Sequence, residues 1–161
     1  MSPDDNSTVG RDTGWTPASP HFHAIVTQCL ERQEFMKHIG CRLTAIEPGH
    51  VEAQITLDKR HQQHDGLSHG GVIATLADVV AGFSVYTLLT DDQLTVTVDM
   101  MISFLEAATG THLRAVGRVV RHGTTTSFAR AEVFACTENK AERLIAIAQA
   151  TFAVRNRLQN R

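Results

Sequence analysis

One acidic residue stands out in this sequence because of its neighbours. Asp78 is the single charged residue in segment 72–89, which is otherwise largely apolar. A buried carboxylate costs several kcal/mol unless it is paired or neutralised, so an acid at this place needs a reason. Asp78 could act as a catalytic base or nucleophile, or it could hydrogen-bond a close neighbour such as Thr75, one helical turn earlier. Both interpretations stay open on this residue alone.

Two glycines precede this segment in the tripeptide His69-Gly70-Gly71. Glycine removes side-chain bulk where the first backbone N–H groups of a helix point outward. The helix dipole favours a negative charge there by about 0.3–1 kcal/mol. The turn could therefore stabilise the oxyanion of an acyl-transfer reaction. The glycines could equally serve only the backbone freedom of a helix-entry turn.

The spacing between these two features constrains how they could act together. Asp78 follows Gly70 by eight residues, an axial rise of about 12 Å at roughly 1.5 Å per residue. One helix cannot bring its own first N–H and this carboxylate to the same substrate atom. We therefore expect the two groups to meet across a subunit boundary.

The elements that must position these residues follow from hydrophobic periodicity. Apolar residues three and four apart predict an amphipathic helix over 21–38, and segment 72–89 predicts a helix buried almost all round. Alternation over 94–104 predicts a strand with an apolar face, carrying Val96 and Val98, and a second face carrying Thr97. Further strands are predicted over 41–47, 51–57, 112–121, 125–136 and 143–154. The fold class is therefore α+β, a curved antiparallel sheet around a long central helix whose uncovered side needs a second subunit.

Length and composition bound the remaining possibilities. With 161 residues, 42% of them hydrophobic, the chain fits one domain over 19–156, between a loose tail at 1–18 and a basic end at 157–161. A net charge of −2 argues against a nucleic-acid partner. Three cysteines without a CxxC spacing and an acidic N-terminus predict reduced thiols and a cytoplasmic location. A membrane span over 72–89 is disfavoured by the carboxylate in its middle.

At two separated places the sequence resembles a known family. The strings QHDGLSHGGVIATLAD, ending at Asp78, and TVTVDMMISFLEAA, beginning at Thr95, are similar to hotdog-fold acyl-CoA thioesterases of the PaaI-like, phenylacetate-degradation branch. The resemblance extends over roughly residues 40–155. It implies hydrolysis of an acyl-CoA without a cofactor, in a homodimer or homotetramer with active sites at the subunit interface, and leaves the acyl group open.

The resemblance also implies roles for individual residues. Asp78 matches the catalytic acid, acting as general base or as nucleophile. Gly70 matches the residue whose backbone N–H polarises the thioester carbonyl, and His69 matches the histidine that shapes this turn. Gln63 matches the amide that positions water or thioester from the opposite subunit, and Thr97 matches a hydroxyl that can hold the water.

Substrate contacts outside this centre are predicted with less support from the residues themselves. Gly71 lies beside the expected oxyanion site. Resemblance and positive charge suggest that a predicted hairpin turn contacts the phosphates of CoA, although the same residues would suit a solvated strand end. The residues of this turn are Arg118, Arg121, His122 and Thr124.

Three alternatives to thioester hydrolysis are weaker: a metal site, a non-catalytic binding module and a dehydratase. The set His61, His64, His69 and Asp65 matches no common zinc spacing, so we expect no metal. A non-catalytic acyl-CoA-binding or regulatory hotdog module remains the alternative to a thioesterase. A hotdog dehydratase is a third possibility, but it would need a catalytic histidine paired with an acid, and only His69 is near the right place.

Overall fold

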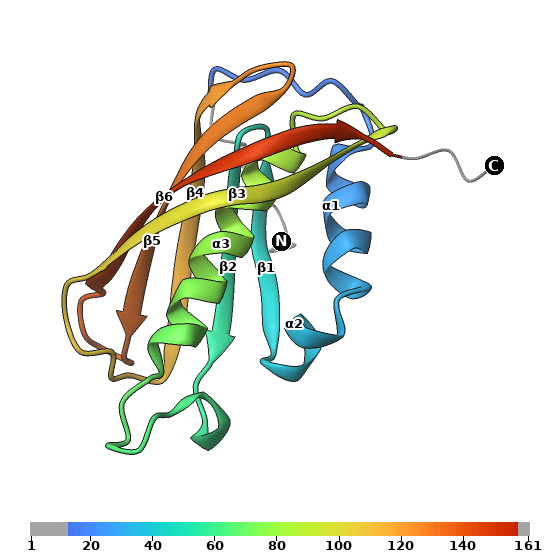
Figure 1. Ribbon diagram of the computed structural model, residues 1–161. Coiled ribbons are helices and arrows are strands. Elements are labelled where there is room, and N and C mark those ends of the chain that lie inside the picture. The colour runs from blue at the N-terminus through green and yellow to red at the C-terminus, as the bar shows by residue number, and fades with distance from the viewer. Residues whose placement is uncertain (1–12, 158–161) are drawn as a thin grey trace, which may run out of the picture.

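The computed structural model describes residues 13–157, which form one antiparallel sheet curved around one long helix (Figure 1). The strand order is β1-β2-β4-β5-β6-β3, so β1 and β3 are the edges. This confirms the predicted fold class, and every strand begins and ends within two residues of its predicted bounds. The elements are β1 (Cys41–Glu47), β2 (His50–Thr56), α3 (Gly70–Tyr86), β3 (Gln93–Phe104), β4 (His112–His122), β5 (Thr126–Cys136) and β6 (Arg143–Asn156).

The central helix α3 lies against the concave face of the sheet at very short range. At Gly117 on β4 an added Cβ would lie 2.1 Å from the carbonyl oxygen of Val80, so the helix backbone meets the strand backbone directly. The opposite face of α3, along Gly71, Thr75 and Asp78, is only partly covered by this chain. We expected this helix to be buried almost all round, but it is buried only on the side that faces the sheet. Within residues 13–157, no helix is long and apolar enough to cross a membrane.

The edge strand β3 differs from the expected regular alternation. Its pairing with β6 shifts register between Thr97 and Asp99. Such a shift adds a residue to one strand and interrupts the alternation of faces. Val96 and Val98 are 55% and 62% exposed. The expected regular alternation is therefore wrong: Thr95 and Thr97 lie toward α3 before the shift, whereas Met100 and Ile102 pack against the core after it.

The predicted helix over 21–38 is in fact two helices, α1 (Phe22–Glu31) and α2 (Glu34–His38), which lie beside β1 (Figure 1). Gln33 separates them in an extended conformation. Val26 of α1 packs in a small cluster with Val51, whereas Met36 of α2 packs in the main core. Ten residues apart on one straight helix, these two side chains would point roughly 80° apart. The break lets each helix bury its own apolar residue.

The segment before α1 also differs from expectation. Trp15 packs over the β1–β2 turn, where its ring occupies the space that a Cβ at Gly49 would need. The Thr13 hydroxyl donates to the Pro48 carbonyl oxygen at 2.5 Å. Residues 13–18 are thus attached to the domain, which the predicted loose tail at 1–18 did not anticipate. Its first twelve residues, and 158–161 of the predicted basic end, lie outside the described residues.

Candidate active site

Two of the predicted site residues are in direct contact. The Thr97 hydroxyl on β3 donates a hydrogen bond of 2.9 Å to Oδ1 of Asp78 in the middle of α3. Thr97 faces the helix because it pairs with Phe152 of β6, which is buried against α3. Asp78 therefore bonds to the edge strand and not to Thr75. The fold brings together two groups that lie 19 residues apart in the sequence.

Asp78 and Thr97 open onto a cavity of about 150 Å³ between α3, β3 and the start of α2. Asp78 is half-buried at its wall. An added Cβ at Gly82 would lie 3.3 Å from the Phe152 ring, so a larger residue there would take up space in the cavity. The remaining walls are mostly apolar or aromatic and comprise Gln33, Val79, Phe83, Tyr86, Thr95 and Phe152. A carboxylate at the side of such a cavity can act on a ligand that is largely apolar.

The start of α3 leaves one backbone donor unused. His69 is the N-cap residue, and its Nδ1 accepts a hydrogen bond of 2.9 Å from the Gly71 N–H. The Gly70 N–H has no acceptor among the described residues. The first N–H groups of a helix lack partners within the helix and sit at the positive end of its dipole. Gly70 can therefore donate to a ligand oxygen.

Gln63 belongs to the loop between Gln62 and the start of α3 at Gly70, and this loop lies at the lower end of the helix in Figure 1. Its backbone N–H donates to the Leu67 carbonyl oxygen at 2.8 Å, and its side chain is half-buried. Neither Gln63 nor Gly70 lines the cavity of Asp78 within one chain. The expected site is thus divided into two halves, one around Asp78 and one around the start of α3.

The predicted phosphate-binding residues do not form one cluster. Arg118 lies on the face of the sheet away from α3 and pairs with Glu132 at 3.3 Å. Arg121 is exposed. His122 is on the other face, where its Nδ1 lies 2.8 Å from the Ser127 hydroxyl, and burial lowers its pKa. Thr124 is exposed in the turn between β4 and β5 and is not near the cavity of Asp78.

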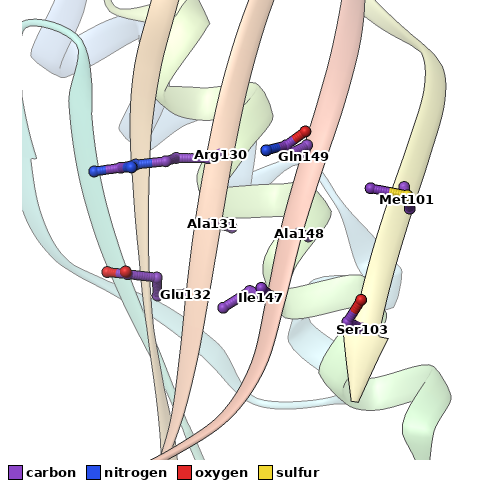
Figure 2. Close-up of a pocket in the computed structure, with 8 residues that line it drawn as sticks. All are labelled: Met101, Ser103, Arg130, Ala131, Glu132, Ile147, Ala148 and Gln149. Carbon is purple, nitrogen blue, oxygen red and sulfur yellow. The ribbon is translucent and has the colours of Figure 1, made fainter. Parts of the chain in front are cut away.

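A second cavity, of about 190 Å³, lies on the face of the sheet away from α3 (Figure 2). Met101 and Ser103 of β3 form one side of it, and Arg130 and Glu132 of β5 form the other, with Ile147 of β6 between them. It contains no residue of the predicted site. The sheet separates it from Asp78.

Histidines and cysteines of the described residues do not suggest another centre. His61 is buried, His64 is exposed and lies 3.2 Å from Asp65, and no group of three or more histidine, cysteine or acidic side chains within residues 13–157 could hold a metal ion. Burial raises the pKa of the Cys41 thiol to about 11. Burial, with Glu142 nearby, does the same for Cys136. Thiols with such pKa values are protonated near neutral pH and are poor nucleophiles.

The cavity beside Asp78 is also lined by residues that sequence reasoning did not predict. Gln33 reaches it through the break between α1 and α2, and Phe152 reaches it through the pairing of β6 with β3. Tyr86, two turns after Asp78 on α3, could have been inferred from helical spacing, since residues four apart share one face. The other two depend on tertiary structure and had no local signal.

An antiparallel sheet curved around one long central helix is the hotdog fold. The family model described as Thioesterase superfamily matches residues 65–142. A protein of Pseudomonas aeruginosa named "Putative esterase PA0474" is 33% identical over 99 residues, which cover 61% of this chain and 70% of that protein. The chain belongs to the thioesterase superfamily, and this membership supports hydrolysis of a thioester as its general activity.

Solved structures agree with this assignment. A thioesterase family protein from Silicibacter pomeroyi is 28% identical, with a TM-score of 0.81 over 84% of this chain and 98% of that chain. A thioesterase from Haemophilus influenzae shares the fold, with a TM-score of 0.73 at 21% identity over 84% of this chain and 91% of that chain.

Proposed function

We propose that the protein hydrolyses an acyl-CoA thioester to the free acid and CoA, with Asp78 as the catalytic carboxylate. The observation that carries this proposal is the hydrogen bond from Thr97 to Asp78 at the wall of a cavity that has both polar and apolar walls. A carboxylate that is oriented by a hydroxyl and faces such a space can meet the carbonyl carbon of an acyl group.

The carboxylate can act in either of two ways. Thr97 occupies Oδ1, so we assign the chemistry to Oδ2. As a general base, Oδ2 takes a proton from water while the water oxygen attacks the thioester carbonyl. As a nucleophile, Oδ2 attacks the carbonyl itself, and water then hydrolyses the mixed anhydride. In both routes the tetrahedral intermediate collapses and CoA leaves as the thiolate.

The oxyanion of this intermediate needs a donor, and we assign that role to the Gly70 N–H. Its amide has no acceptor among the described residues and lies at the positive end of α3. The neighbouring Gly71 N–H already donates to His69. The Gly70 N–H is therefore the one that we assign to the carbonyl. Removal of one such donor typically slows catalysis by about 10²–10³-fold.

The two halves of the site would meet in a homodimer. The partly covered face of α3 and the exposed side chains of edge strand β3, including Val96 and Val98, support a subunit interface at this place. Across it, Gly70 and Gln63 of one subunit would approach Asp78 of the other. We further propose that the exposed Arg121 and Thr124 at the β4–β5 turn contact the CoA phosphates. Three free thiols support a cytoplasmic location.

The test is thiol release from acetyl-, butyryl-, octanoyl- and phenylacetyl-CoA, measured for the unsubstituted protein and for Asp78→Asn. We expect CoA release by the former and loss of turnover in the latter, with an unchanged circular dichroism spectrum. Asp91→Asn is the matched control, since Asp91 is exposed beyond the end of α3, and it should keep full activity. Binding of acyl-CoA without thiol release would favour the non-catalytic module, and full activity in folded Asp78→Asn would contradict the role of Asp78.

A further inference from the structure

A buried histidine ties the loop before α3 to the rest of the domain. His61 is 1% exposed. Its Nδ1 accepts a hydrogen bond of 3.0 Å from the Asp58 N–H, and its Nε2 lies 2.9 Å from the Ile39 carbonyl oxygen. A backbone N–H can only donate and a carbonyl oxygen can only accept, so Nδ1 is unprotonated and Nε2 carries the proton. The ring thus connects two backbone segments, one at Asp58 and one at Ile39.

The backbone of the same residue reaches the start of α3. The His61 carbonyl oxygen accepts a hydrogen bond of 2.7 Å from the His69 N–H. His69 in turn accepts from the Gly71 N–H through its Nδ1. A continuous path of hydrogen bonds therefore runs from Ile39 through His61 and His69 to the first turn of α3, where the Gly70 N–H is left over.

We propose that His61 is a positioning residue that sets the direction of the Gly70 N–H. Gly70 and Gly71 have no side chains that could fix their own backbone, so the orientation of this amide must come from the residues before it. The two ring bonds hold the backbone of His61 in place, and its carbonyl oxygen then holds His69. The inference rests on the proposed function of Gly70 as oxyanion donor.

Two substitutions of His61 each remove one of the two hydrogen bonds that its ring makes. His61→Asn keeps an acceptor near the place of Nδ1 and loses the donor to Ile39. His61→Gln keeps a donor near the place of Nε2 and loses the acceptor for Asp58. The matched control is His64→Asn, in the same loop, because the His64 side chain is 85% exposed. Both His61 variants should lower kcat by about 10–100-fold, part of the loss expected for a whole oxyanion donor. KM should stay within about threefold.

A pair of non-hydrolysable ligands tests the amide directly. One is a butyryl-CoA analogue in which CH₂ replaces the thioester sulfur, so that the carbonyl remains. The other is butyl-CoA, a thioether without a carbonyl. The unsubstituted protein and His64→Asn should bind the ketone about three- to tenfold more tightly than the thioether, the contribution of one hydrogen bond. In the His61 variants this preference should disappear while thioether binding is unchanged.

The outcomes separate the two proposals. If the unsubstituted protein binds neither ligand or does not distinguish them, Gly70 is not the donor, and the role of His61 fails with it. If the unsubstituted protein prefers the ketone and folded His61 variants keep that preference and the original kcat, the role of His61 alone is wrong. A lower melting temperature with unchanged kcat per folded molecule would give His61 a structural role only, and would also overturn the inference.

Discussion

The Thr97 hydroxyl and the Asp78 carboxylate, 2.9 Å apart, connect the edge strand β3 to the middle of α3. The bond leaves one carboxylate oxygen for chemistry. It also makes the direction of the carboxylate depend on the path of β3, which bulges directly after Thr97. The strand at the proposed subunit interface and the proposed catalytic carboxylate are therefore directly connected.

Removal of the Thr97 hydroxyl should impair the orientation of Asp78. Thr97→Val keeps the shape of the side chain, and we expect kcat to fall by about 10–100-fold, because a misdirected carboxylate rarely reaches its target. Thr97→Ser should retain most activity. Thr95→Val is the control, since Thr95 lines the same cavity but donates to the Ala153 carbonyl oxygen. Steady-state kinetics measure the effect, and equal losses in both valine variants would contradict it.

A larger residue at Gly82 should narrow the cavity. In Gly82→Val the new side chain would enter the space between α3 and the Phe152 ring, where a Cβ alone lies 3.3 Å away. We expect kcat/KM to fall by about 10-fold or more for octanoyl- or phenylacetyl-CoA, and much less for acetyl-CoA, because only the larger acyl groups need that space. A uniform loss across the panel would mean that the acyl group binds elsewhere.

Gly117 should be essential for packing. In Gly117→Ala the new Cβ would collide with the Val80 carbonyl oxygen, 2.1 Å away, so the helix or the strand must move. Overpacking of this kind costs typically about 1–3 kcal/mol, which urea denaturation would measure. Val120→Ala, an exposed position on the same strand, should cost much less. A Gly117→Ala protein of unchanged stability would show that α3 can shift freely.

The ion pair between Arg114 and Glu142 should give a pH-dependent contribution to stability. The hydrogen bond that Arg114 donates to Glu142 lowers the pKa of the Glu142 carboxyl below the usual 4.5. The folded protein therefore favours the ionised form. The contribution to stability is complete above about pH 4.5, and it disappears as the pH falls through the lower pKa that Glu142 has in the folded protein. Glu142→Gln should cost about 0.2–1 kcal/mol at pH 7, as for exposed pairs, and nothing in strong acid.

The control for this prediction is Glu138→Gln in the same connection between β5 and β6, where the side chain is exposed. Thermal unfolding of both variants from pH 3 to 7 measures the difference. A loss in Glu142→Gln that is equally large at pH 3 and pH 7 would contradict an electrostatic origin.

Residue patterns predicted the part of the fold that depends on local periodicity. A single charge in a long apolar segment identified Asp78, and alternation together with turn-forming residues identified the strands to within two residues. Thr97 came from resemblance, and its contact with Asp78 required the actual register of β3 against β6. Whether the family roles of Asp78, Gly70 and Gln63 apply to this chain stays a prediction.

Features that depend on tertiary packing were not accessible in the same way. The break at Gln33 serves two separate packing sites, and no residue there is a strong helix breaker. Val96 and Val98 are exposed because Thr95 and Thr97 face α3 before the bulge in β3, and the alternation of residue types does not reveal that bulge. Gln33 lines the cavity because of the break between α1 and α2, and Phe152 lines it because β6 pairs with β3.

Trp15 has a practical consequence as the single tryptophan of the chain. Its indole ring rests on the backbone at Gly49, remote in sequence from every group assigned to catalysis. Its fluorescence therefore reports whether the N-terminal segment is seated on the β1–β2 turn. Release of this segment would change the emission spectrum, which gives the molecule an intrinsic optical probe of this contact.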